Sequence, residues 1–194
     1  MAERGRIGSD APLFAWGEAL RAARARRATL RRRAAVLGVG MALLATTIAI
    51  PPRPRLVWNA SASAPLGLYG ITYKSTVRRG STVLARLPRD MRALAAARRY
   101  LPGNVPLIKS AAALAGDEVC ALGPTILIDG EPVVTRRSYD FAGRVLPWWE
   151  GCHRLRNGEM FLLMTGNANS FDGRYFGVTQ GTDVIGKAHL IWAR

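Results

Sequence analysis

An uncharged apolar run near the N-terminus limits what this chain can fold into more than any other feature. Residues 34–50 are seventeen consecutive positions without a charge, Asn, Gln or Pro. As a helix that rises about 1.5 Å per residue, the run is roughly 25 Å long, which is short but sufficient to cross a membrane. Pro51 and Pro52 follow and end the helix. We therefore expect a transmembrane helix over residues 34–50.

Positive charge is concentrated directly before this run. The 194 residues carry a formal net charge of +15, and residues 1–33 hold nine arginines against three acids. Because lysine and arginine accumulate on the cytoplasmic side of a span, the sequence predicts a cytoplasmic basic segment over 1–33 and an extracytoplasmic domain over 53–194. The arginines are expected to contact anionic lipid headgroups rather than a specific nucleic acid.

A secretory signal and a buried helix fit the apolar run less well than a span does. A cleaved secretory signal needs a shorter apolar region and a small-x-small cleavage site, whereas residues 47–49 are followed at once by Ile50 and two prolines. A soluble DNA-binding protein would use the arginines as a phosphate-binding arm, but a domain of about 140 residues would then have to enclose a helix that is apolar all round. A membrane anchor is the favoured interpretation.

After the apolar run, short strand-like stretches alternate with turn signals. Asp129-Gly130 is a hairpin signal between two such stretches. Residues 88–99 carry four arginines behind Pro88 and predict a helical insertion. The predicted strands are 83–85, 107–108, 118–122, 125–128, 133–134, 161–164 and 184–192. The fold class is therefore a mostly β domain attached to one N-terminal helix.

The two cysteines, Cys120 and Cys152, both follow the span and would lie in an oxidising compartment. They can close a loop of about thirty residues as a disulfide, worth roughly 3 kcal/mol, or remain two unpaired thiols. The two histidines, His153 and His189, have no ligand spacing with a cysteine or carboxylate, so neither a metal nor another cofactor is expected. The same scarcity argues against a histidine-based catalytic triad.

A loop rich in small residues, 59–69, would expose a serine to a substrate carbonyl. Such a serine needs a base, and the remaining candidate is a lysine whose pKa falls on burial. The domain after the span holds three lysines, and only Lys109 lies in an apolar stretch. A neutral Lys109 amine could take the serine proton and return it to the leaving group.

Three motifs follow the apolar run in order. They are Ser61-x-Ser63-x-Pro65-x-Gly67-Leu68-Tyr69, then Pro106-Leu107-Ile108-Lys109 leading to Gly116-Asp117, and Ser170-Phe171-Asp172-Gly173-Arg174-Tyr175-Phe176-Gly177. In this order they resemble the type I signal peptidases, and most closely the conjugative-transfer, TraF-type members. The resemblance covers residues 34–194. It implies a domain of small coiled antiparallel sheets with an exposed hydrophobic face that meets the membrane.

The resemblance also implies which residues do the chemistry. Ser63 matches the nucleophile, and Lys109 matches the general base. Ser61 and the backbone amide of Ser63 match the donors of an oxyanion hole, which would stabilise the tetrahedral intermediate.

Three further residues match supporting positions of the family. Ser170 matches a serine that orients the lysine, and Asp172 and Arg174 match an ion pair that supports the site. Ser110 departs from the arginine that usually follows the lysine, and Ser81 departs from an aspartate. Both departures affect support more than chemistry.

The function implied by this resemblance is a membrane-anchored Ser/Lys endopeptidase at the outer, periplasmic face of a bacterial inner membrane. Its substrate would be a pilin precursor or another component of a conjugative transfer apparatus, with small residues at the cut. The acyl-enzyme could pass to water or to an amine of the same chain, which would give a cyclic product. The alternatives are general removal of secretory signals, a non-catalytic assembly protein, and DNA contact by the arginine segment.

Overall fold

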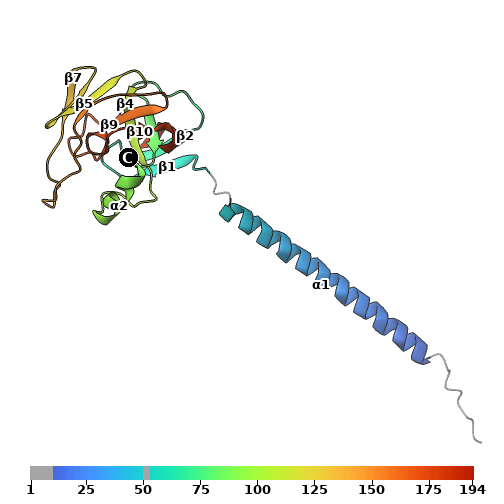
Figure 1. The fold of residues 1–194 in the computed structure, drawn as a ribbon. Helices are drawn as coiled ribbons and strands as arrows, with labels where there is room; N and C mark the ends of the chain where they lie inside the picture. The colour runs from blue at the N-terminus through green and yellow to red at the C-terminus, as the bar shows by residue number, and fades with distance from the viewer. Residues whose placement is uncertain (1–10, 50–52) are drawn as a thin grey trace, which may run out of the picture. The chain divides into compact units, whose positions relative to one another are not determined.

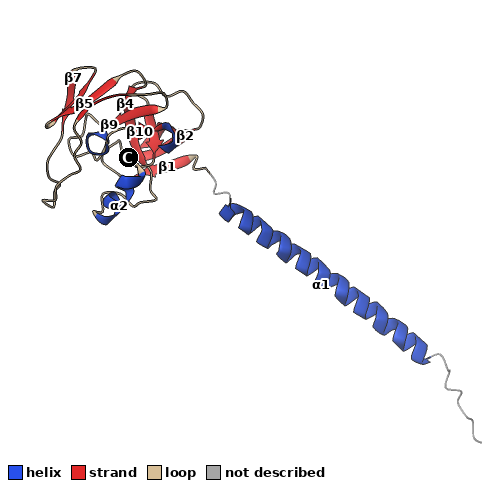
Figure 2. Cartoon of the chain, in the orientation of Figure 1, coloured by secondary structure: helices blue, strands red, loops and turns tan. Residues whose placement is uncertain are grey.

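The computed structural model describes residues 11–49 and 53–194, and these belong to two compact units that divide after Arg53. The first unit contains the long helix α1 (Ala11–Ala49), and the second contains the strands and the shorter helices (Figure 1, Figure 2). The expected end of the span, residues 50–52, and the first ten residues of the basic segment lie outside the described residues.

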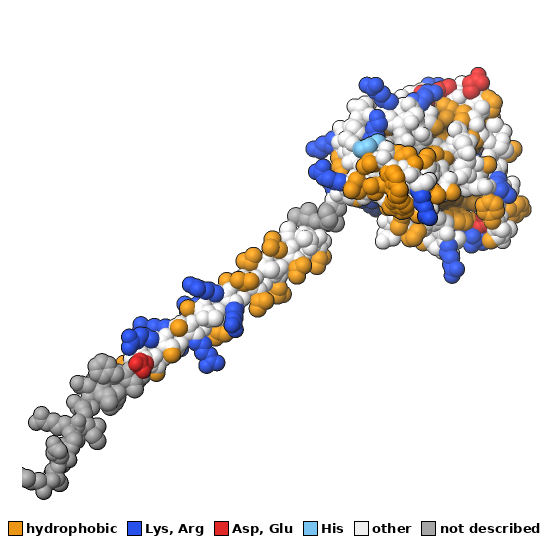
Figure 3. Space-filling model, turned by 180° about the vertical axis from the view of Figure 1, so that it is seen from behind, with side chains coloured by type: hydrophobic (Ala, Val, Ile, Leu, Met, Phe, Trp, Pro, Cys, Tyr) orange, Lys and Arg blue, Asp and Glu red, His pale blue; other side chains and the backbone are white. Residues whose placement is uncertain are grey.

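Helix α1 begins at Ala11, well before the start of the predicted span at position 34. Residues 11–33 are rich in Ala, Arg and Leu, which are strong helix formers, so the helix runs through the arginine block into the apolar run. Figure 3 shows basic side chains along the N-terminal part of α1 and apolar side chains along the part that follows. The stretch Trp16–Ala49 is long and apolar enough to cross a membrane.

The strands of the described residues form two antiparallel sheets. One has seven strands in the order β1-β2-β11-β3-β4-β9-β10, and the other has four in the order β7-β6-β5-β8. The strand bounds are β1 (Leu56–Asn59), β2 (Gly67–Thr72), β3 (Thr82–Ala85), β4 (Leu107–Leu114), β5 (Glu118–Leu122), β6 (Thr125–Ile128), β7 (Glu131–Thr135), β8 (Gly151–Arg154), β9 (Glu159–Leu163), β10 (Thr179–Gln180) and β11 (Val184–Ala193). The predicted mostly β, antiparallel class is confirmed.

Three short helices connect the strands: α2 (Arg89–Ala97), α3 (Gly173–Phe176) and the 3-10 turn η1 (Gly181–Asp183). Helix α2 lies inside the stretch 88–99 that the sequence predicts as helical. Helix α3 lies close against β9, because a Cβ on Gly173 would be only 2.7 Å from the Leu162 carbonyl oxygen. Any side chain at position 173 would push α3 and the loop before it away from the sheet.

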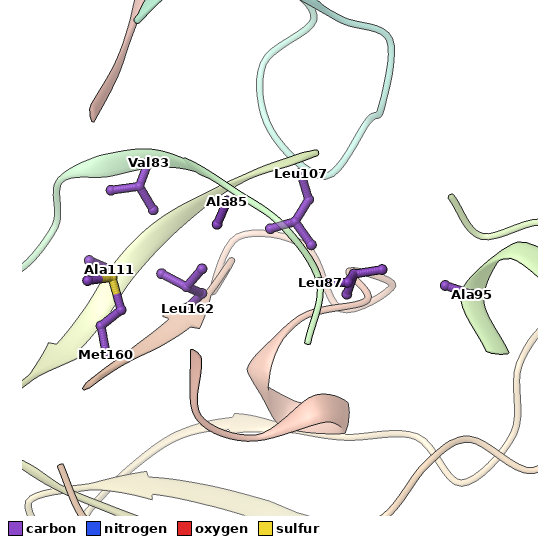
Figure 4. Packing of buried hydrophobic residues seen from close by; sticks show 8 residues of the cluster. All are labelled: Val83, Ala85, Leu87, Ala95, Leu107, Ala111, Met160 and Leu162. Atoms are coloured by element: carbon purple, nitrogen blue, oxygen red, sulfur yellow. The ribbon is translucent and has the colours of Figure 1, made fainter. Parts of the chain in front are cut away.

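One core cluster lies between β3, β4, β9 and α2. Its buried members are Val83, Ala85, Leu87, Ala95, Leu107, Ala111, Met160 and Leu162 (Figure 4). Leu107 and Ala111 belong to one face of β4, and Lys109 lies between them on that same face because strand side chains alternate. The register of the strand therefore directs a polar side chain, Lys109, into a buried environment.

A disulfide joins neighbouring strands of the four-stranded sheet. Cys120 of β5 and Cys152 of β8 are paired in register with Cα atoms 4.0 Å apart, which confirms the bridge that the sequence allows. Glu118 lies beside the two sulfurs in a grouping of potential metal-ligand atoms. Both sulfurs are consumed by the disulfide, and only thiolates bind metal ions well.

Candidate active site

The loop between β1 and β2 presents Ser61 and Ser63 side by side. Their Oγ atoms are 3.0 Å apart, and the Ser63 backbone N–H donates to Ser61 Oγ at 3.4 Å. Ser61 is exposed and Ser63 is half-buried. The Ser61 hydroxyl therefore lies within hydrogen-bond distance of both the Ser63 hydroxyl and the Ser63 backbone N–H.

The side chain of Asn59, the last residue of β1, forms hydrogen bonds with the backbone of this loop. Its side-chain Nδ2 donates to the carbonyl oxygens of Ser61, Ala64 and Pro65 at 3.0 to 3.1 Å, and its Oδ1 accepts from the Ser61 backbone N–H. Asn59 is 8% exposed, so these bonds are protected from water. One buried amide thus fixes the backbone on both sides of Ser63.

Lys109 is buried in the strand β4, with 3% of its surface exposed. Burial lowers the pKa of its ammonium from 10.5 to about 8; nearby Asp172 raises this pKa and Arg174 lowers it. The Nζ atom donates a hydrogen bond of 2.7 Å to Ser170 Oγ. The structure therefore brings together Lys109 and Ser170, which are 61 residues apart in the sequence, and makes the neutral amine accessible near physiological pH.

Asp172 and Arg174 form a fully buried ion pair behind Ser170. Arg174 Nε lies 2.8 Å from Asp172 Oδ1, and its terminal nitrogen donates to the Met164 carbonyl oxygen. Asp172 Oδ2 accepts from the Met164 backbone N–H at 3.0 Å. The pair thereby closes the loop 164–172, and this closure determines where the Ser170 hydroxyl lies.

A second asparagine connects the two loops. Asn167 Nδ2 donates to the Ala62 carbonyl oxygen at 3.0 Å, and the Asn167 carbonyl oxygen accepts from the Ser170 backbone N–H. The loop that carries Ser170 is therefore bound directly to the loop that carries Ser63. Neither Asn59 nor Asn167 could be assigned a role from the sequence, because nothing in their local pattern separates them from ordinary turn residues.

A cavity of about 720 Å³ contains the candidate reactive groups. Ser61, Ser63 and Lys109 all line it, whereas Ser170, Asp172 and Arg174 do not. Within residues 53–194, no hydrogen bond joins Ser63 to Lys109 directly. The arrangement offers a hydroxyl and a weakly basic buried amine to a ligand in one shared cavity.

Comparison with known proteins places the chain in a family. Residues 28–193 match the family described as signal peptidase, peptidase S26. The chain belongs to the peptidase S26 family. This signal peptidase is 32% identical over 129 residues to the plasmid transfer protein TraF of Escherichia coli, covering 61% of this chain and 72% of TraF. A signal peptidase I crystal structure from Enterococcus faecalis has 19% identity and a TM-score of 0.35, covering 58% of this chain and 97% of that one.

The family confirms the resemblance predicted from the three motifs. The protein is a serine-type signal peptidase, and its substrates are polypeptides. Its long apolar N-terminal helix agrees with membrane anchoring.

Proposed function

We propose that this signal peptidase cuts its substrate with a Ser63/Lys109 dyad. The observation that carries the proposal is the buried Lys109 amine, whose lowered pKa suits a base and which lines the same cavity as Ser63. A neutral amine has one lone pair and two N–H groups. The hydrogen bond to Ser170 uses one N–H, which leaves the lone pair available to the Ser63 hydroxyl.

In the proposed acylation step, Lys109 Nζ takes the Ser63 proton while Ser63 Oγ bonds to the substrate carbonyl carbon. The oxyanion accepts hydrogen bonds from Ser61 Oγ–H and from the Ser63 N–H, which exchanges its bond to Ser61 Oγ for the one to the oxyanion. The Lys109 ammonium then donates its proton to the leaving amine as the C–N bond breaks, and an acyl-enzyme remains. Ser170 keeps the amine in place throughout, and Asp172 and Arg174 keep Ser170 in place.

The proposed substrate is a pilin precursor or another exported component of a conjugative transfer apparatus. This assignment is supported by the relationship to a protein named as a plasmid transfer protein. The small side chains around Ser63 favour a cut between small residues. Water would release a linear product from the acyl-enzyme, and an amine of the same chain would release a cyclic one.

We propose that the apolar run, residues 34–50, spans the bacterial inner membrane, with the basic segment 1–33 cytoplasmic and residues 53–194 periplasmic. The arginine block before the apolar run supports this orientation. Trp58 and Trp192, both about half exposed, pack with ring centroids 5.7 Å apart, and amphipathic indole rings of this kind suit the lipid headgroup level.

The test is intact-mass analysis of a candidate pilin precursor co-expressed in bacterial membranes with this chain. We expect loss of a defined segment, and a further deficit of one water if the product is cyclic. An unchanged precursor together with shortened ordinary preproteins would favour a general signal peptidase. If both classes of substrate kept their full mass, a non-catalytic assembly role would replace the proposal.

Activity is expected to increase with pH through one ionisation near pH 8. Below that pH the Lys109 ammonium has no lone pair, and above it the neutral amine can accept the Ser63 proton. The measurement is kcat/KM for one peptide across the pH range, with circular dichroism at each pH as a control for folding. If kcat/KM rose only near the ordinary lysine pKa of 10.5, or did not change with pH, the role given to Lys109 would be contradicted.

A further inference from the structure

The cavity that holds Ser63 and Lys109 has a second wall that the reaction does not use. It is built from the segment after α2 and from the segment 137–146, which are distant in the sequence. We call it the aromatic wall; its members are Tyr100, Leu101, Val105, Tyr139, Phe141 and Leu146. The cavity volume of about 720 Å³ is far larger than small side chains at a cut would fill.

One half of the aromatic wall is a hairpin over residues 139–145, which the carboxylate of Asp140 holds closed. Tyr139 pairs with Val145 across the hairpin. Asp140 accepts hydrogen bonds from the backbone N–H groups of Ala142 and Arg144 and from Arg144 Nε. The hairpin therefore needs no ligand to adopt its shape.

The same carboxylate ties the hairpin to the segment after α2. Tyr100 donates from its hydroxyl to Asp140 Oδ2 at 2.5 Å, and Arg98 donates to the Val145 carbonyl oxygen at 2.6 Å. The two halves of the wall are thus held together before anything binds. A surface ordered in advance loses little entropy on binding a ligand.

Several apolar side chains of the aromatic wall are exposed to solvent. Phe141 is 80% exposed, Tyr139 56% and Val105 42%, although all three line the cavity. The Arg137 guanidinium lies 5.1 Å from the Phe141 ring centroid, yet most of the ring stays exposed, and an apolar partner that covered it would gain the free energy of burial. The aromatic wall lines the same cavity as Ser63 and Lys109. A substrate polypeptide bound there for cleavage would therefore contact the wall.

We propose that the aromatic wall binds a bulky apolar residue of the substrate polypeptide, at a position away from the small residues at the cut. This inference rests on the proposed function, because it takes the chain beside Ser63 to be the substrate. It assigns selection of the substrate to two places: small residues beside Ser63, and one large apolar residue at Phe141 and Tyr139.

The test uses the full chain in detergent micelles and synthetic peptides with one Ala-x-Ala cut motif in a serine background. A single leucine is moved through successive positions on each side of the cut. We expect one window of positions to raise kcat/KM about tenfold over the leucine-free parent, mainly by lowering KM. Phe141→Ala should abolish this preference, so that leucine no longer raises kcat/KM over the leucine-free parent.

Val145→Ala is the matched control. Val145 lies on the same hairpin and is 63% exposed, but it does not line the cavity. We expect this variant to keep the leucine preference within twofold. A preference that survives in Phe141→Ala, or one lost equally in both variants, would overturn the proposal.

A binding measurement separates this inference from the proposed function. The same peptides carry a fluorescent label, and their binding is followed by fluorescence anisotropy. Leucine-dependent binding that Phe141→Ala weakens about tenfold, without any cleavage, would support the wall and contradict the peptidase dyad. Cleavage that Ser63→Ala abolishes, without a leucine preference, would support the dyad and contradict the wall. If Phe141→Ala weakened only the binding of the chain to lipid vesicles, the proposal that the aromatic wall binds substrate would also be overturned.

Discussion

Ser63→Ala is expected to lower kcat/KM by roughly 10³-fold or more, because the variant has no oxygen that can attack the substrate carbonyl. Lys109→Met should have an effect of similar size, since it fills the same space without an amine that could take the proton. The two residues act as one unit, so the double variant should be no slower than either single variant. The measurement is steady-state cleavage of one peptide by purified full-length chain.

Two matched controls separate loss of chemistry from loss of folding. Ser110→Ala removes the hydroxyl next to Lys109 in β4, outside the cavity that holds Ser63. Lys187→Met removes the lysine of β11 that is paired in register with Val83 of β3. On the opposite edge of β3, the same Val83 is paired with Lys109 of β4. Both controls should retain activity within a fewfold. If Lys187→Met and Lys109→Met were equally inactive, the base would not be assigned to Lys109.

Local patterns in the sequence predict seven of the eleven strands in the described residues and do not predict β1, β2, β8 and β10. Strands β5 and β6 have the predicted bounds because apolar residues define them and the Asp129-Gly130 hairpin signal ends β6. The sequence does not predict β2 because Gly67 and Gly70 resemble loop residues. They are glycines because β11 passes so close: a Cβ on Gly70 would lie 2.4 Å from the His189 ring. That requirement comes from a strand more than a hundred residues away.

In the candidate site, too, local sequence patterns predict some residues, whereas other contacts form only in the folded chain. Ser63 and Lys109 could be proposed from residue types and motif order, because a nucleophile and an apolar-flanked lysine are visible locally. The bond from Asn167 to the Ala62 carbonyl oxygen spans 105 residues and exists only once both loops are folded. The aromatic wall likewise depends on Tyr100 meeting Asp140, which no local pattern predicts.

Asp172→Ala is expected to destabilise the chain by roughly 3–5 kcal/mol, because it leaves the Arg174 guanidinium buried without a counter-charge. Replacing both partners, as in Asp172→Ala with Arg174→Met, should recover part of the loss because no buried charge remains. The measurement is chemical unfolding of the full chain in detergent. Asp183→Ala, which breaks the partly exposed pair with Arg92, should cost about 1 kcal/mol or less.

The Asp172 variants also test how the ion pair is connected to the reactive groups. Asp172 accepts the Met164 backbone N–H and so closes the loop that carries Ser170, the hydrogen-bond partner of Lys109. Cleavage by Asp172→Ala should therefore fall in kcat even at temperatures where the chain is fully folded, while KM changes little. A loss of stability with an unchanged kcat would show that the ion pair supports the fold alone and that Ser170 holds the amine without its help.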